Sequence, residues 1–177
     1  MPIFAARAQM MDGKATLALQ LKNEARQQEA AKAAGKPPIE FNWHPDTNSW
    51  APAALFNAMI APLTPLPIRG AIWYQGESNT DKDRAPIYSK LFQTMIQDWR
   101  AHWAQGNFPF IFVQIANYNT TPGNGWPIIR DAQRRALSLT NTGMAVTIDI
   151  GDADNIHPRD KQDVGHRLAL WARVLSY

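Results

Sequence analysis

Residues near the end of the chain could form part of a hydrolytic site. The stretch "DNIHPRDKQDVGHRLAL" at 154–170 places Asp154 three residues before His157, between a β-branched run and an amphipathic helix. An imidazole acts as a general base when a carboxylate holds its other ring nitrogen and so fixes tautomer and orientation. The spacing predicts such an acid–base pair, with Asp149 and Asp152 as alternative carboxylates. A turn aspartate followed by a helix-entry histidine is the other interpretation of the same pattern.

A second stretch, "WYQGESN" at 73–79, brings polar groups to the end of an apolar run. Gln75 and Asn79 supply amide donors, and Glu77 adds a carboxylate. Gly76 has no Cβ, so its backbone can approach a ligand closely. Donors at such a place suit an oxyanion hole, which stabilises negative charge as it develops. The alternative is a polar turn whose side chains cap its own backbone.

Composition excludes several classes of function. The 177 residues suffice for one domain with a core, and the formal charge of +3 is spread over interspersed acids and bases. A nucleic-acid partner is therefore not expected, because it requires a clustered basic face. The absence of cysteine excludes disulfides and zinc–thiolate sites. No group of residues has metal-ligand spacing and no glycine-rich phosphate loop is visible, so neither a metal nor another cofactor is expected. The sequence also shows no membrane span and no signal peptide.

Strands and helices alternate from residue 70 onward. Before that point, the sequence predicts a largely polar helix over 14–34 and a proline-rich connecting segment with a short helix over 52–61. Three strand–helix units in succession imply a parallel sheet with right-handed crossovers. The polar loops that follow the strands then share the carboxyl edge of the sheet, where ligands bind in open α/β folds. The predicted strands are 70–75, 108–116 and 143–151, and the predicted helices are 87–103, 126–139 and 160–175.

Together these loops resemble a known family. The stretches "GAIWYQGESN", "FPFIFVQIANY", "NTGMAVTIDIG" and "DNIHPRDKQDVGHRLAL", with "LFNAMIAPL" before them, are similar to the sialate O-acetylesterases of the SGNH hydrolase superfamily. The resemblance covers about residues 50–175 in order. It implies an α/β fold, a three-layer α/β/α sandwich with a flavodoxin-like parallel sheet, of which about three strands are present here. Residues 1–49 are interpreted as a helical and irregular connector, and 50–177 as the SGNH hydrolase-like domain.

The resemblance also implies a function and roles for individual residues. The family hydrolyses O-acetyl esters on sugars, including sialic acid, with a serine nucleophile. His157 would be the general base and Asp154 would orient it. Gln75 and the Gly76 backbone would hold the oxyanion, and Glu77 and Asn79 would organise that loop. The expected partner is an acetylated sugar, with no nucleic acid and no membrane, and the resemblance favours a periplasmic or secreted location.

The family's serine lies near the N-terminus in a glycine–serine loop, and this chain has no such motif. Its serines are Ser49, Ser78, Ser89, Ser138 and Ser176. We therefore expect a fragment that lacks its nucleophile strand and loop, is inactive alone, and has the missing N-terminal part of its own domain as a partner. Ser78 is a possible stand-in. A non-catalytic carbohydrate-binding remnant is the alternative function, with sugar-stacking rings at Trp43, Trp50, Trp73, Tyr74 and Tyr118.

Overall fold

The computed structural model describes residues 13–42, 44, 46–47 and 51–176. These residues divide into two compact units, one ending at Thr64 and the other beginning at Pro65. The boundary at 49–50 expected from the sequence stays a prediction. None of the helices within the described part of the chain is long and apolar enough to cross a membrane.

The first unit contains α2, Gly13–Ala33, which matches the predicted helix over 14–34. Its leucines at 19 and 21 are exposed, as expected for a largely polar helix. The segment after α2 is tied back to it because the Gln28 amide exchanges two hydrogen bonds with the Ile39 backbone. The short helix expected over 52–61 is found as a π turn η1, Phe56–Ile60, followed by a 3₁₀ turn η2, Ala61–Leu63.

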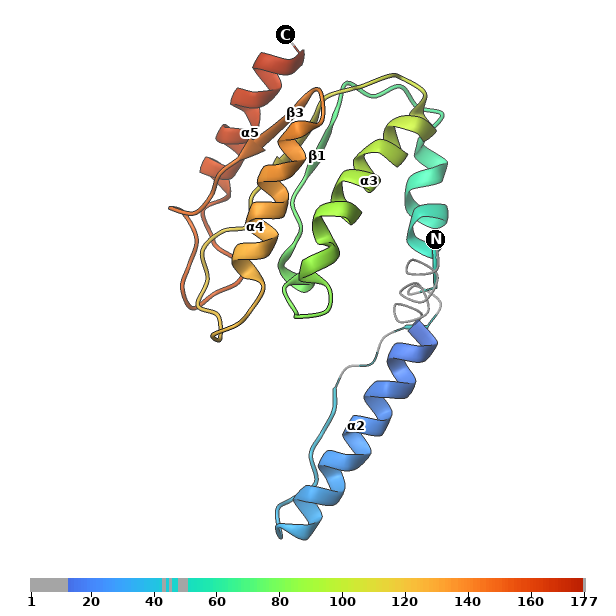
Figure 1. The fold of residues 1–177 in the computed structure, drawn as a ribbon, viewed down its shortest axis with the longest axis vertical. Helices are drawn as coiled ribbons and strands as arrows, with labels where there is room; N and C mark the ends of the chain where they lie inside the picture. The colour runs from blue at the N-terminus through green and yellow to red at the C-terminus, as the bar shows by residue number, and fades with distance from the viewer. Residues whose placement is uncertain (1–12, 43, 45, 48–50, 177) are drawn as a thin grey trace. The chain divides into compact units, whose positions relative to one another are not determined.

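The second unit is a three-stranded parallel sheet covered by helices, and it confirms the α/β prediction (Figure 1). The strand order is β1-β2-β3, with Phe110 opposite both Ala71 and Thr142. In chain order the elements are β1 Ala71–Trp73, η3 Glu77–Asn79, α3 Ala85–Trp103, β2 Phe110–Val113, α4 Trp126–Arg135, η4 Ala136–Ser138, β3 Thr142–Ala145 and α5 Lys161–Ser176.

Alternating side chains of β2 define three layers. Phe112 meets the ring of Phe92 on α3 edge-on, with ring centroids 5.0 Å apart, so α3 and its neighbour α4 lie on that face. Val113 points to the opposite face and packs with Ala145 and with Val164 of α5. Helices therefore cover both faces of β2 (Figure 1).

The start of the sheet is fixed by a buried arginine. Arg100, near the end of α3, donates to the Phe108 carbonyl from Nε and Nη2 and to the Asn141 carbonyl from Nη2. These carbonyls belong to residues just before β2 and β3. One guanidinium therefore holds the starts of both strands next to each other. Burial lowers the pKa of Arg100, but an arginine stays charged, and its Nε and Nη2 both donate here.

The third strand is shorter than the sequence predicts. β3 ends at Ala145 instead of continuing to 151. Beyond it, the Thr147 hydroxyl donates to the Gln114 carbonyl at 2.6 Å, and the Ile150 N–H turns back to the Thr147 carbonyl. A side-chain hydrogen bond thus takes the place of the backbone bonds of the sheet. The side chains of Val146 and Ile148, which suggested a longer strand, are exposed.

Packing of α5 on β3 depends on Gly143. A methyl group there would lie 2.6–2.8 Å from three ring carbons of Trp171, closer than van der Waals contact permits. We expect Gly143→Ala to lower the free energy of unfolding by about 1–3 kcal/mol, because α5 must move away from the strand. Gly165→Ala, on the same helix with nothing within 4 Å, should raise it by about 0.5–1 kcal/mol. Urea unfolding measures both, and equal effects of the two variants would contradict this packing.

Candidate active site

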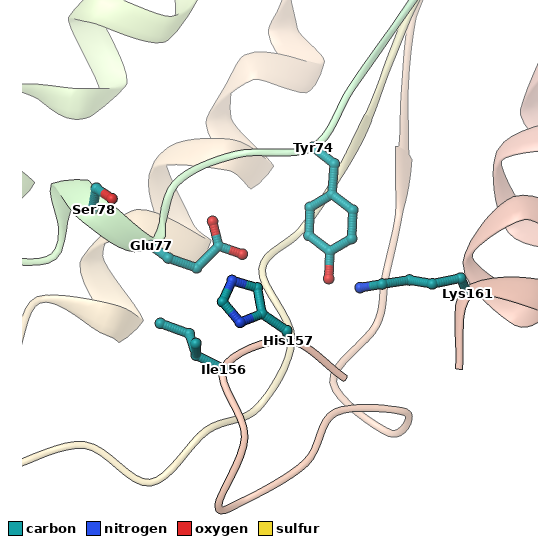
Figure 2. Close-up of a pocket in the computed structure, with 6 residues that line it drawn as sticks. All are labelled: Tyr74, Glu77, Ser78, Ile156, His157 and Lys161. Atoms are coloured by element: carbon teal, nitrogen blue, oxygen red, sulfur yellow. The ribbon is translucent and has the colours of Figure 1, made fainter. Parts of the chain in front are cut away.

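One cavity brings the two sequence motifs together. It has a volume of about 460 Å³ and opens at the carboxyl edge of the sheet (Figure 2). One wall comes from the segment that follows β1 and the other from the segment between β3 and the start of α5. Its lining residues are Tyr74, Glu77, Ser78, Ile156, His157 and Lys161.

The polar side chains in this cavity converge on the imidazole. Figure 2 shows the Glu77 carboxylate and the Tyr74 hydroxyl directed toward the His157 ring. The Lys161 ammonium lies 4.9 Å from the centroid of the Tyr74 ring, within cation–π range. Burial, and then the charge of Glu77, raise the pKa of the Tyr74 hydroxyl, which therefore stays a neutral donor. The cavity thus holds a carboxylate, an ammonium group and a phenol around one imidazole.

The acid–base pair expected from the sequence lies on an exposed loop. Asp154 accepts a long hydrogen bond, 3.4 Å, from the Asn119 amide, and its own N–H donates to Asp152. The backbone N–H of His157 donates to Asn155. Among the described residues, no carboxylate is hydrogen-bonded to the His157 ring. Two carboxylates are therefore candidates to orient the His157 ring. Asp154 is close to it in sequence, and Glu77 points toward it in Figure 2.

Asp149, an alternative orienting carboxylate, is engaged elsewhere. Both of its oxygens accept from Arg167, at 2.6 and 2.7 Å, and Arg167 also donates to the Val146 carbonyl. These bonds hold the first part of the β3–α5 loop against α5. The Arg167 hydrogen bonds lower the pKa of Asp149 to about 2.

The proposed oxyanion residues lie behind the cavity lining. The Gln75 side chain donates from Nε2 to Asn79 Oδ1 at 2.6 Å, and its Oε1 accepts from the Tyr88 hydroxyl at 3.2 Å. Gly76 is buried with φ +155°, a conformation that L side chains rarely adopt. A Cβ there would meet Ile115 at 2.9 Å. A glycine is thus required at the turn between β1 and Glu77.

Two of the three described aromatic rings considered for sugar stacking pack against other rings of the domain. Trp43 and Trp50 lie outside the described residues. Trp73 packs edge-on against Trp99, and Tyr118 packs on Trp126. Of the described rings in that set, Tyr74 alone lines the cavity.

Sequence reasoning did not single out Lys161 or the support residues of the Gln75 turn. Lys161 was within reach, since it follows His157 by four residues in the quoted motif. The contacts of Tyr88 and Gln133 with Gln75 give no local signal, because the two residues lie in helices 13 and 58 residues further along the chain.

The serines are placed as follows. Ser78 lines the cavity, beside Glu77. Ser89 lies in α3, Ser138 in η4 and Ser176 at the end of α5, while Ser49 is outside the described residues.

A parallel α/β sheet thus presents an imidazole and a carboxylate in one cavity at its carboxyl edge, where open α/β folds bind ligands and where such groups can act as acid and base. A family model described as carbohydrate esterase, sialic acid-specific acetylesterase, matches residues 21–172. The chain therefore belongs to this family. Among solved structures, a carbohydrate acetylesterase from Xanthomonas citri is similar, with a TM-score of 0.67 and 41% identity. That match covers 83% of this chain and 33% of the other.

Curated relatives agree with this placement. The mouse sialate O-acetylesterase is 41% identical over 144 residues, which cover 71% of this chain and 26% of the mouse protein. The human sialate O-acetylesterase is 38% identical, with 71% and 27% covered. A protein from Arabidopsis thaliana of solved structure matches with a TM-score of 0.56 at 25% identity, covering 72% of this chain and 55% of that one. The chain therefore spans about a quarter of the length of the curated relatives it matches.

The Asp149–Arg167 pair gives stability a defined pH dependence. The pKa of Asp149 is lowered from 3.8 to about 2 on folding. The stabilisation is therefore fully present above about pH 4 and is lost as the pH falls toward 2. Urea unfolding of the native chain and of Asp149→Asn at several pH values should give free energies that differ at neutral pH and converge in acid. In an Arg167→Met background, the effect of Asp149→Asn on the free energy of unfolding should no longer depend on pH. A pH dependence that persists in that background would show that another group is responsible.

Proposed function

We propose that this chain supplies the general base and the oxyanion donors of a serine-dependent carbohydrate O-acetylesterase. The observation that carries the proposal is the meeting of the 74–79 and 154–161 segments in one cavity around His157, in a member of the acetylesterase family. The domain interpretation, a connector over 1–49 and a hydrolase domain over 50–177, belongs to the same proposal.

The reaction would proceed through an acetyl-enzyme. A serine hydroxyl attacks the acetyl carbonyl while His157 accepts its proton, and the sugar hydroxyl leaves with that proton. The Gly76 N–H, supported by Gln75, binds the negative oxygen of the tetrahedral intermediate. Water, activated by the same imidazole, then releases acetate. We assign the serine to the polypeptide that corresponds to the remaining length of the relatives, with Ser78 as the alternative within this chain.

Two carboxylates compete for the role of orienting His157. Asp154 has the support of the family resemblance, but its carboxylate is exposed and bonded at 3.4 Å to Asn119. Glu77 has the support of its direction toward the ring in Figure 2. Catalytic hydrogen bonds in unliganded enzymes are often loose and tighten only with substrate bound, so both remain candidates.

The finer proposal is that the sugar carries a carboxylate, as sialic acid does. Lys161 supports it, because its ammonium is the one cationic group among the cavity-lining residues of the described chain. A charge-assisted hydrogen bond from Lys161 to a substrate carboxylate contributes about 1.5–3 kcal/mol.

The test of the mechanism uses this chain alone and a chimeric enzyme, in which the chain replaces the aligned third of the Xanthomonas citri acetylesterase. We expect the chimera to hydrolyse 4-nitrophenyl acetate and the chain alone to be nearly inactive. His157→Ala should lower kcat about 10²–10⁴-fold, because the general base is lost. Asp154→Asn and Glu77→Gln, compared side by side, identify the orienting carboxylate by the larger loss.

Ser78→Ala is the matched control for this assignment. It should keep the activity of the chimera, and a fluorophosphonate should label a serine outside this chain. Labelling of Ser78 would transfer the nucleophile to this chain. Activity that survives His157→Ala would end the proposed mechanism, and glycan binding without hydrolysis, measured by calorimetry, would favour the carbohydrate-binding alternative.

Substrate charge is tested at Lys161. Lys161→Met in the chimera should lower kcat/KM for O-acetylated sialic acid about tenfold or more, because a charged contact is lost. The same variant should leave kcat/KM for the neutral 4-nitrophenyl acetate nearly unchanged. Equal losses on both substrates would contradict a role in carboxylate recognition.

A further inference from the structure

The peptide between Gln75 and Gly76 is held from inside the domain. The Gln75 carbonyl accepts hydrogen bonds from Gln133 Nε2 at 3.0 Å and from the Tyr88 hydroxyl at 3.1 Å. In a trans peptide the N–H points opposite to the C=O. Two donors that fix this carbonyl toward α3 and α4 therefore fix the direction of the Gly76 N–H as well. No described residue accepts a hydrogen bond from that N–H, although Gly76 is buried.

Gln133 is fully buried and uses both ends of its amide. Its Oε1 accepts the N–H of Ile115 at 3.0 Å, while its Nε2 donates to Gln75. One side chain of α4 thus joins the chain segments that leave β1 and β2. An amide of that length supplies a donor and an acceptor together without needing to be protonated. A buried amide without these bonds would destabilise the fold, so its place here is specific.

Close packing also restricts rotation of the 75–76 peptide. A Cβ at Gly76 would lie 3.1 Å from Gln133 Nε2 and 3.0 Å from Ile129, so the glycine backbone rests directly on α4. Rotation of the 75–76 peptide would have to displace these groups. Burial raises the pKa of Tyr88 to about 12, so the second donor stays protonated at any working pH.

We propose that Gln133 is a positioning residue for the oxyanion site: by fixing the Gln75 carbonyl inside the domain, it turns the Gly76 N–H toward the cavity of His157. The inference rests on the proposed function, in which that N–H binds the oxygen of the acetyl group. Tyr88 assists from α3 by sharing the same carbonyl. The preorganised donor needs no rearrangement when negative charge develops.

Kinetics of the chimeric enzyme test the role. Gln133→Met keeps the side-chain length and removes both hydrogen bonds. We expect kcat to fall by up to the roughly 10²–10³-fold that loss of an oxyanion donor costs, with KM little changed, because the contact strengthens only in the transition state. Tyr88→Phe should give a smaller loss in the same direction. Gln93→Met, at a half-buried amide of α3 that donates to Ser89, is the matched control and should retain kcat.

Gln133→Glu separates positioning from structural support. The introduced carboxyl still accepts from Ile115, but it donates to the Gln75 carbonyl only when protonated. The ratio of its kcat to that of the native enzyme should therefore rise as the pH is lowered, whereas the ratio for Gln133→Met should stay flat. A flat ratio for both variants, or a kcat for Gln133→Met within about threefold of the native value, would overturn the inference.

Crystal structures of the native 177-residue chain and its Gln133→Met variant give a second, independent readout. We expect the 75–76 peptide to rotate in the variant, so that the Gly76 N–H no longer faces the cavity. An unrotated peptide would contradict the role of Gln133 whatever the activity. If the chimera hydrolyses no acetyl ester at all, the proposed function fails, and the crystal structures still decide the positioning role. If Gln133→Met does not fold, Gln133→Glu is crystallised instead at a pH where the introduced carboxyl is ionised and cannot donate to the Gln75 carbonyl, on the same criterion.

Discussion

The parallel pairing of three short strands is the constraint on which both halves of the site depend. β2 pairs with β1 and β3 in the same direction, so the segments after β1 and β3 leave the sheet at one edge. Strands of three or four residues hold this register because the central strand β2 is buried on both faces, whereas β1 and β3 are only partly buried. A slip of one residue would turn Phe112 and Val113 toward the wrong helices. The meeting of Glu77 and His157 in one cavity is therefore a consequence of core packing.

Beyond the strand ends, hydrogen bonds from side chains replace the backbone hydrogen bonds of the sheet. Thr147 bonds the Gln114 carbonyl, Gln133 bonds the backbone at Gln75 and Ile115, and Arg167 bonds Val146 and Asp149. Each of these hydrogen bonds joins a side chain to a segment that is distant in sequence. Each loop is therefore held in place by a neighbouring element. Buried backbone groups must find such partners where no strand supplies them. The loops of this edge are thus as specified as the strands, although they have no regular structure.

Local pattern predicted the elements well and their ends less well. The helices over 87–103 and 160–175 and the parallel order of the sheet followed from periodicity and alternation. The strand over 143–151 was too long because Val146 and Ile148 continue an apolar alternation with no neighbouring strand to pair with. Gln133 was missed for a related reason. Its role comes from contacts with residues far along the chain, and a polar residue in a helix looks like any surface residue until the fold buries it.

The two halves of the site differ in how firmly they are held, and the chemistry explains why. An oxyanion donor acts only if its direction is already fixed, since a dipole that must reorient loses the energy it would contribute. The Gly76 turn accordingly rests on buried Ile115, Ile129 and Gln133. A general base must instead move a proton twice, from the nucleophile to the leaving group and then from water. In the proposed mechanism His157 is that base; it lies on an exposed loop, and none of the described carboxylates is hydrogen-bonded to its ring, so a carboxylate must still orient the ring when substrate binds.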